Sequence, residues 1–294
     1  MLGDNLKSYL QLHFIVFIWG FTAVIGALIS LDALPLVWFR MSIAVLLVLL
    51  YIIVKRIPLK IPPKTIIGFL IAGLVIALHW LTFFKAIKVS NVSVTLACLS
   101  TGAFFTALLE PLFFGRKVIW YEVLFGLFVV GGLYIIFKFE GNYFEGIVLA
   151  LTSAFLSACF SIINGKYAKE YDPTVITLYE LFGGVFFLSL YLLFTGSFTP
   201  EFFVVSSNDW IWLFVLGSFC TAYAFIVSVQ VMKFLSPYTV MLTINMEPVY
   251  GIILALLVFN DKEKMSWTFY LGAAIIITTV ILNGILKKYT KTAK

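Results

Sequence analysis

A carboxylate and a proline interrupt an apolar stretch late in the chain. The segment TINMEPVYGIILALLVF, residues 243–259, places Glu247 inside a run otherwise suited to hydrocarbon. A continuous helix would carry four polar residues on one face, at i, i+4, i+8 and i+11: Thr239, Thr243, Glu247 and Tyr250. A carboxyl on such a face can bind a cationic group or carry a proton, and the proline after it can kink the helix. The alternative is a structural glutamate that bonds Arg40 or a backbone amide of a neighbouring helix.

Three further ionisable side chains lie in apolar runs: Arg40, Glu180 and His79. The planar guanidinium of Arg40 suits a carboxylate, but a long cationic side chain near a helix end can instead snorkel or form a structural ion pair. Glu180 shares a helical face with Thr177 and Gly184, which suits either ligand or proton contact or a buried salt bridge. Histidine titrates near neutral pH, so His79 is a candidate proton carrier; the alternative is a plain hydrogen-bonding role.

Two other features could either line a water-filled cavity or pack against a neighbouring helix. Trp19 lies in the middle of its apolar run, where its ring could line a cavity or pack against a helix of small residues. Small polar side chains repeat on one face of the segment 144–165: Ser153, Ser157, Ser161 and Asn164. Such a stripe permits close helix packing with hydrogen bonds, and it can equally face water. Glu110 lies near the end of its run beside Arg116 and Lys117, which predicts interfacial pairing.

Several classes of chemistry lack their motifs. The three cysteines, Cys98, Cys159 and Cys220, lie in apolar runs without a CxxC pair and are expected to be packing residues. Two histidines are too few for a metal centre. The sequence has neither a phosphate-binding glycine loop with its lysine nor a GxSxG turn. We therefore expect no metal, no nucleotide cofactor and no catalytic residues.

The composition indicates how these polar groups must be positioned. The chain is 62% hydrophobic and 12% charged, with a mean hydropathy of +1.08. A bilayer core requires about 20 apolar residues per helix, and the 294 residues contain ten such runs. These are residues 9–29, 34–54, 64–85, 89–113, 118–138, 144–165, 175–195, 210–231, 238–259 and 267–286. The loops between them are short, so the sequence predicts an all-α integral membrane protein without a soluble domain.

The basic residues predict the orientation. With a cytoplasmic N-terminus, one side collects fourteen of them: Lys7, Lys55, Arg56, Lys60, Lys64, Arg116, Lys117, Lys166, Lys169, Lys233, Lys287, Lys288, Lys291 and Lys294. The other side collects five: Lys85, Lys88, Lys138, Lys262 and Lys264. This bias predicts that both termini are cytoplasmic. The net charge of +6 therefore reflects topology, and it gives no reason to infer nucleic-acid binding.

An internal repeat divides the chain into residues 1–140 and 141–294. A shift of 145 residues lays 86–117 over 231–262, with Lys88 on Lys233 and Phe114 on Phe259. Hydropathy and loop positions agree without a gap, and a shift of 146 then lays Gly126 on Gly272. Each half contains five spans, an odd number, so the halves must cross the membrane in opposite senses. Inverted repeats of this kind are a transporter architecture with a site near the midplane.

The chain resembles the EamA branch of the drug/metabolite transporter superfamily. The resemblance rests on the ten-span layout, on the WG at Trp19, on the WFR that ends at Arg40, and on EPVYGIILALL from Glu247. One departure is the turn after the fourth span, GRK, where the family often has GE. The resemblance implies secondary transport of small metabolites, commonly export of amino acids or related compounds, without a nucleotide cofactor.

Together these observations predict alternating access in the plasma membrane. A central cavity between the repeats would bind a small zwitterion, its carboxylate toward Arg40 and its amine toward Glu180 or Glu247, with protons as a possible coupling ion. The apolar spans 118–138 and 267–286 would form scaffold or a dimer surface, in a monomer or a homodimer. The alternatives are a broad-specificity drug exporter, a lipid flippase with a laterally open groove, and a membrane enzyme. Scattered single ionisable groups disfavour the enzyme.

Overall fold

The ten predicted spans are present as helices. The computed structural model describes residues 4–115, 120–139 and 141–292, so the predicted start Val118 and the basic residues Arg116, Lys117 and Lys294 lie outside the described residues. The spans are α1 (Asp4–Leu28), α2 (Ala33–Lys55), α3 (Pro63–Val89), α4 and α5 (Val92–Leu99, Gly102–Phe114), α6 (Trp120–Phe139), α7 (Phe144–Tyr167), α8 (Pro173–Phe194), α9, η3 and α10 (Ser207–Gly217, Ser218–Tyr223, Ala224–Val231), α11 and α12 (Pro237–Ile244, Glu247–Phe259) and α13 (Trp267–Thr292). Three short 3₁₀ turns, η1 (Gly141–Tyr143), η2 (Pro200–Phe203) and η4 (Asn260–Glu263), lie between spans.

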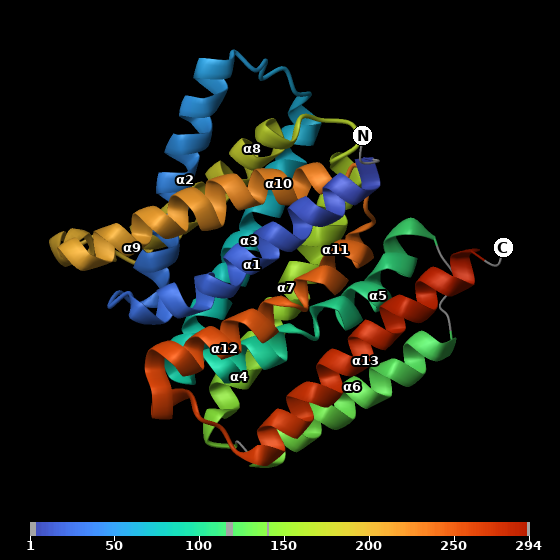
Figure 1. The fold of residues 1–294 in the computed structure, drawn as a ribbon. Helices are drawn as coiled ribbons and strands as arrows, with labels where there is room; N and C mark the ends of the chain where they lie inside the picture. The colour runs from blue at the N-terminus through green and yellow to red at the C-terminus, as the bar shows by residue number, and fades with distance from the viewer. Residues whose placement is uncertain (1–3, 116–119, 140, 293–294) are drawn as a thin grey trace.

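The fold class is confirmed. The described residues contain helices and no strands. Eight of their segments are long and apolar enough to cross a bilayer, and two shorter apolar stretches, Leu124–Ile136 in α6 and Trp267–Thr279 in α13, complete the ten. The first described turn of α1 and the last described turn of α13 lie toward the same end of the bundle (Figure 1), as an even number of spans requires. We call this the terminal end.

Two spans break at equivalent positions of the repeat. The fourth span breaks at Ser100–Thr101 and the ninth at Asn245–Met246, which is the 145-residue shift found in the sequence. At the first break, the Ser100 and Thr101 hydroxyls donate to the carbonyls of Ala97 and Cys98. Such side-chain bonds compete with the helix ladder. At the second break, the proline at position 248 lacks the donor that a continuous helix would need.

The break in the ninth span corrects the predicted polar face. Thr243 belongs to α11, whereas Glu247 opens α12. Asn245 and Met246 bond three residues back, to Leu242 and Thr243, which tightens the turn and changes the direction of the chain. Residues spaced at i, i+4 and i+8 on either side of the break therefore do not lie on one helical face.

The eighth span contains a π-helix. Residues Ser218–Tyr223 (η3) wind more widely between α9 and α10. A π turn leaves carbonyl groups without their usual i+4 partner, and such turns are frequent at functional sites. No pattern in the sequence predicts this π-helix.

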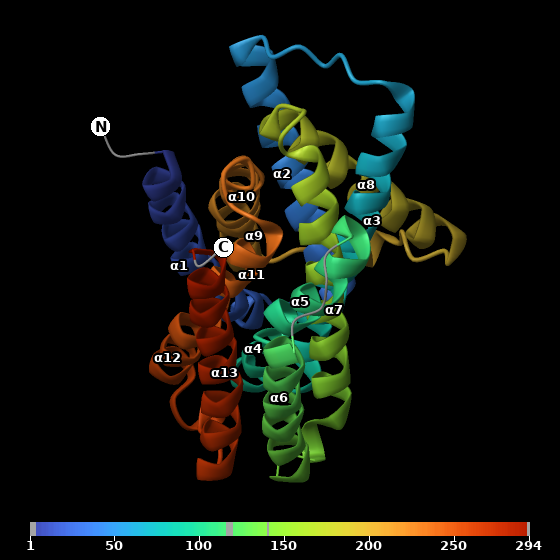
Figure 2. The same ribbon diagram turned by 90° about the vertical axis from the view of Figure 1, so that its right-hand side faces the viewer.

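Helix α3 joins the two repeats. It packs against α7 and α8 of the second repeat, and α1 packs against α12, so the halves are interleaved (Figures 1 and 2). The α3–α8 crossing depends on glycine. A Cβ on Gly73 would lie 2.1 Å from the Glu180 carbonyl oxygen and 2.9 Å from the Gly184 nitrogen. Gly183 faces the Leu70 backbone in the same way. Small residues let the backbones meet without a gap.

The last helices of the two repeats form a pair at the edge of the bundle. In Figure 1, α6 and α13 lie side by side and run in opposite directions, which is the inverted relation that odd-numbered repeats require. Gly132 and Gly272 face each other, since a Cβ on either would lie 2.9 Å from the carbonyl oxygen of the other. This peripheral position agrees with a scaffold role.

The end of the bundle opposite the terminal end is held by two carboxylates. Asp209 of α9 accepts hydrogen bonds from the backbone and hydroxyl of Ser30, just after α1. Glu263 of η4 accepts from the Val92 and Ser93 amides, at 3.0 and 2.9 Å. The α4 N-terminus is thus capped by a charge that complements its dipole. Both contacts join one repeat to the other.

We expect Gly73→Ala to destabilise the protein, because the added methyl group would displace the α8 backbone. Overpacking of this kind costs about 1–3 kcal/mol. Gly131→Ala on α6 is the matched control, since a Cβ there has nothing within 4 Å. The measurement is the thermal unfolding midpoint in detergent. Equal midpoints for the two variants would contradict the proposed crossing.

Candidate functional site

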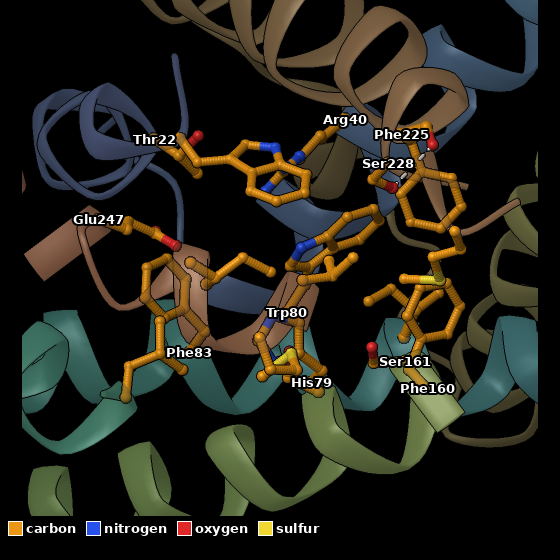
Figure 3. A pocket seen from close by; sticks show the side chains of 18 residues that line it. Thr22, Arg40, His79, Trp80, Phe83, Phe160, Ser161, Phe225, Ser228 and Glu247 are labelled. Atoms are coloured by element: carbon orange, nitrogen blue, oxygen red, sulfur yellow. Dashed lines mark hydrogen bonds between the residues drawn. The ribbon is translucent and has the colours of Figure 1, made fainter. Parts of the chain in front are cut away.

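A cavity lies between the repeats, with both charged and aromatic walls. It contains about 750 Å³ of space not filled by protein atoms, including its opening. Figure 3 shows the lining side chains, which come from both halves of the chain. The polar ones are Trp19, Thr22, Arg40, His79, Ser157, Ser161, Ser228 and Glu247. The larger apolar ones are Trp80, Phe83, Phe160, Phe225, Met232 and Met241. Six of the residues singled out in the sequence therefore meet here: Trp19, Arg40, His79, Ser157, Ser161 and Glu247.

Arg40 is held inside the protein and does not snorkel. Its side chain is 1% exposed. The guanidinium carbon lies 4.2 Å from the centre of the Trp80 ring and 5.4 Å from that of Phe84, a cation–π arrangement. Nε donates to the Thr221 hydroxyl at 2.6 Å, and Nη2 lies 3.4 Å from the Cys220 carbonyl oxygen. Nη1 makes no hydrogen bond to the described residues.

The π-helix provides the acceptors that fix this corner of the cavity. The Cys220 carbonyl, which faces Arg40, also accepts from the Trp19 indole at 3.1 Å. The Thr221 hydroxyl donates a hydrogen bond to the Leu216 carbonyl at 2.7 Å, so the hydroxyl oxygen faces Arg40 as an acceptor. The widened turn thus binds one side chain from α1 and one from α2. Trp19 takes the cavity-lining position and also hydrogen-bonds the second repeat.

Glu247 faces the same cavity as Arg40 without bonding it. It is 6% exposed, and its carboxyl group points into the cavity (Figure 3). Its position is the first residue of α12, where a helix dipole favours negative charge. The structure records no ion pair between Glu247 and Arg40 and no hydrogen bond from the Glu247 carboxyl to another described residue. Arg40, one of the structural partners expected from the sequence, attracts Glu247 across the cavity without a direct contact, and no backbone amide of the described residues is recorded as bonding it.

His79 is anchored to the serine stripe of α7. Its Nδ1 lies 2.9 Å from the Ser153 carbonyl oxygen, while the Ser153 hydroxyl lies 2.8 Å from Nδ1 and donates to the His79 carbonyl. Because a carbonyl oxygen only accepts, Nδ1 carries a hydrogen. The ring stacks on Phe83 at a centroid distance of 6.1 Å. Within the stripe, Ser153 makes a helix contact, and Ser157 and Ser161 line the cavity.

Glu180 lies in a separate buried cluster. It is fully buried, and its Oε1 accepts from the Asn164 amide at 2.9 Å. Three polar atoms of this cluster have no hydrogen bond to the described residues: Glu180 Oε2, Asn164 Oδ1 and Thr177 Oγ1. No cation pairs with Glu180 among the described residues. None of these three residues lines the cavity, so Glu180 does not form its wall opposite Arg40.

The remaining sequence candidates also lie outside the cavity. Thr243 donates to the Thr239 carbonyl in its own helix. The Tyr250 ring packs edge-on against Phe17 of α1, at 5.5 Å. Glu110 is buried and borders a second recess of about 1050 Å³ at the terminal end, together with Lys169 of the turn after α7 and Ser236 of the loop before α11. The basic neighbours expected to pair with Glu110 lie outside the described residues.

Several lining residues were missed in the sequence. Trp80 lies well inside α3, which continues to Val89, and it is buried under Arg40. Phe160 and Phe225 pack on each other at 5.2 Å and close one wall. The only available signal was position: Trp80 follows His79 directly, and Phe160 precedes Ser161. Aromatic residues are too frequent here, at 18%, for type alone to identify them.

Comparison with known proteins agrees with this architecture. The model of the EamA-like transporter family matches residues 6–138 and again residues 144–285. An uncharacterised transporter of Clostridium kluyveri is 26% identical over 138 residues, which is 47% of this chain and 43% of that protein. A solved crystal structure described only as that of a protein covers 95% of this chain and 98% of its own, with a TM-score of 0.70 and 15% identity. The last likeness concerns the fold alone.

We expect Thr221→Val to destabilise the protein, because the Arg40 guanidinium would lose its closest acceptor. A hydrogen bond to a charged group contributes about 1.5–3 kcal/mol. Thr82→Val is the matched control, since that hydroxyl donates only to carbonyls of its own helix. Thermal unfolding in detergent gives the comparison, and the prediction fails if the two substitutions lower the midpoint equally.

Proposed function

Because the chain belongs to the EamA-like transporter family, we propose that it is a secondary exporter of small zwitterionic metabolites such as amino acids, working by alternating access in the plasma membrane. The positive-inside bias of the sequence supports cytoplasmic termini. The single observation that carries the cargo class is the presence of Arg40 and Glu247 on one cavity without an ion pair between them.

A zwitterion supplies the two charges that these residues lack. Arg40 Nη1 has no hydrogen bond among the described residues, and the Glu247 carboxyl group points into the cavity. A buried charge in a membrane costs roughly 2.5–3.5 kcal/mol even on lenient scales, so both groups gain from a partner of opposite sign. A cargo carboxylate matches the guanidinium fork, and a cargo amine matches Glu247. The aromatic walls between them suit an apolar side chain.

Alternating access is supported by the different state of the two ends. Met232 lines both the central cavity and the recess at the terminal end, so the two spaces adjoin at this side chain. At the opposite end, Asp209 and Glu263 join the repeats through hydrogen bonds. A recess that adjoins the cavity at one end, and hydrogen bonds that join the repeats at the other, fit a carrier that faces one side at a time.

Proton coupling is assigned to Glu180 in this proposal. Intramembrane carboxyls that face no cation commonly serve proton relays. The buried ionisable side chains of α2 and α3, which pack on α8, are engaged elsewhere, Arg40 with Thr221 and His79 with Ser153. Glu180 therefore has only the Asn164 amide as a recorded partner. Its separation from the cavity allows proton and cargo to bind at different places.

We expect Arg40→Ala and Glu247→Gln each to reduce cargo exchange about 10- to 100-fold, because each removes a charged contact of about 1.5–3 kcal/mol. The measurement is counterflow of labelled leucine, phenylalanine and threonine in proteoliposomes. Lys60→Ala and Glu145→Gln are matched controls at exposed positions. Unchanged exchange in both cavity variants would remove these residues from the cargo site.

We expect Glu180→Gln to separate coupling from exchange. The amide retains an oxygen for Asn164 but cannot bind and release a proton. Accumulation driven by a pH gradient should fall at least tenfold, while exchange without a gradient stays within about twofold of the wild type. Thr177→Val, which keeps the carboxyl group, is the control. If both activities fall together, or neither changes, Glu180 has a structural role only.

A further inference from the structure

The breaks in the fourth and ninth spans leave backbone carbonyl groups without a hydrogen bond. In each span, two residues at the break have carbonyl oxygens to which no hydrogen bond is recorded from the described part of the chain: Leu99, Ser100, Ile244 and Asn245. For Ile244 the reason is Pro248, since the residue that would donate to its carbonyl has no N–H. The two pairs are equivalent under the 145-residue shift, so both repeats leave the same acceptors unpaired.

These acceptors lie where water is scarce. Leu99, Ser100 and Asn245 are buried, and Ile244 is half-buried. A buried backbone carbonyl without a donor is uncommon in folded proteins. The last carbonyls of a helix also carry partial negative charge, and within membranes the ends of half-helices and unwound carbonyls coordinate cations. The two breaks therefore attract a positively charged hydrogen-bond donor.

Both breaks border the central cavity beside a carboxyl group. Leu99 and Ile244 line the cavity together with Glu247. The broken spans pack on each other, α4 on α12 and α5 on α11. At this crossing a Cβ on Gly251 would lie 2.3 Å from Leu96 Cδ1. Glu247 opens α12, and its carboxyl group points into the cavity (Figure 3). One negative charge and the ends of two half-helices thus share one space.

We propose that the two breaks and Glu247 together bind the primary ammonium group of the cargo, and that they select primary amines over N-methylated ones. The inference rests on the proposed function, which supplies a zwitterion. A primary ammonium group has three N–H donors, which match the Glu247 carboxylate and one carbonyl from each break, those of Leu99 and Ile244. Each N-methyl group removes a donor but keeps the positive charge. Glu247 alone would not distinguish these amines by charge, whereas the carbonyls count their N–H groups.

Competition for counterflow in proteoliposomes tests this selectivity. Each of labelled leucine, phenylalanine and threonine that the protein exchanges is competed with its own N-methyl, N,N,N-trimethyl and α-methyl derivatives. We expect the half-inhibitory concentration to rise roughly tenfold with one N-methyl group and roughly 100-fold with three, because a site built to hydrogen-bond N–H groups rejects analogues that lack them. The α-methyl derivative adds volume next to the amine but keeps all three donors, so it should remain within about threefold of the parent.

Three outcomes of the competition would overturn the inference. Equal inhibition by the parent and the N-methylated compounds would show that only charge is recognised. Equal weakening by N-methyl and α-methyl groups would show that the amine pocket is limited by size alone. If none of the three amino acids is exchanged, the cargo class itself is wrong and the inference falls with it. The first two outcomes leave the proposed function intact.

Pro248→Ala tests the ninth-span break directly. Alanine restores the N–H that a continuous helix directs at the Ile244 carbonyl, so one acceptor of the ammonium site is lost. We expect the ratio of half-inhibitory concentrations, N-methyl derivative over parent, to fall at least threefold. Pro63→Ala is the matched control, because Pro63 begins α3 at an exposed position where an N–H has no acceptor in the helix. An unchanged ratio in Pro248→Ala, or an equal change in both variants, contradicts the role of the break. If Pro248→Ala does not exchange, the wild-type series decides.

Discussion

The burial of one positive charge at the junction of the repeats constrains the rest of the structure. Arg40 comes from the first repeat, and its hydrogen-bond acceptors, Thr221 and the Cys220 carbonyl, come from the second. A guanidinium within a bilayer requires such partners. A regular α-helix would have used that carbonyl in its own ladder, so the π turn is what makes it available. The ring of Trp80 completes the enclosure, and one guanidinium nitrogen, Nη1, is left without a hydrogen bond among the described residues.

This constraint links local backbone geometry to the placement of charge. Glu247 opens a half-helix because the ninth span breaks at Asn245, and the break turns its carboxyl group into the same cavity. The interleaving of α3 with α7 and α8 brings His79 beside the serine stripe and leaves Glu180 behind it. Cargo and proton sites in the proposed function are thus distributed by helix crossings, with Gly73 and Gly184 fixing the closest of them.

The spans could be predicted from the sequence because bilayer thickness sets their length, and the 145-residue shift anticipated that Ser100 and Asn245 are equivalent. Facing was harder. Helical spacing placed Thr243 and Tyr250 with Glu247, but a break changed the direction of the chain between them. Glu180 shares a depth and a face with plausible ligands, yet only the α3–α8 crossing decides that it lies apart from the cavity. The π turn depends on Arg40 and Trp19, far away in sequence, so no local pattern indicates it.

The carboxylate contacts at the end opposite the termini bias the resting state. Opening that end requires Asp209 to leave Ser30 and Glu263 to leave the α4 amides, and charge-assisted bonds contribute about 1.5–3 kcal/mol each. Because opening must break these contacts, even one of them disfavours the open form roughly 10- to 100-fold. In the proposed alternating access, the cargo-free protein is therefore closed at this end, and the cargo must bind the open form more tightly by the free energy that opening costs.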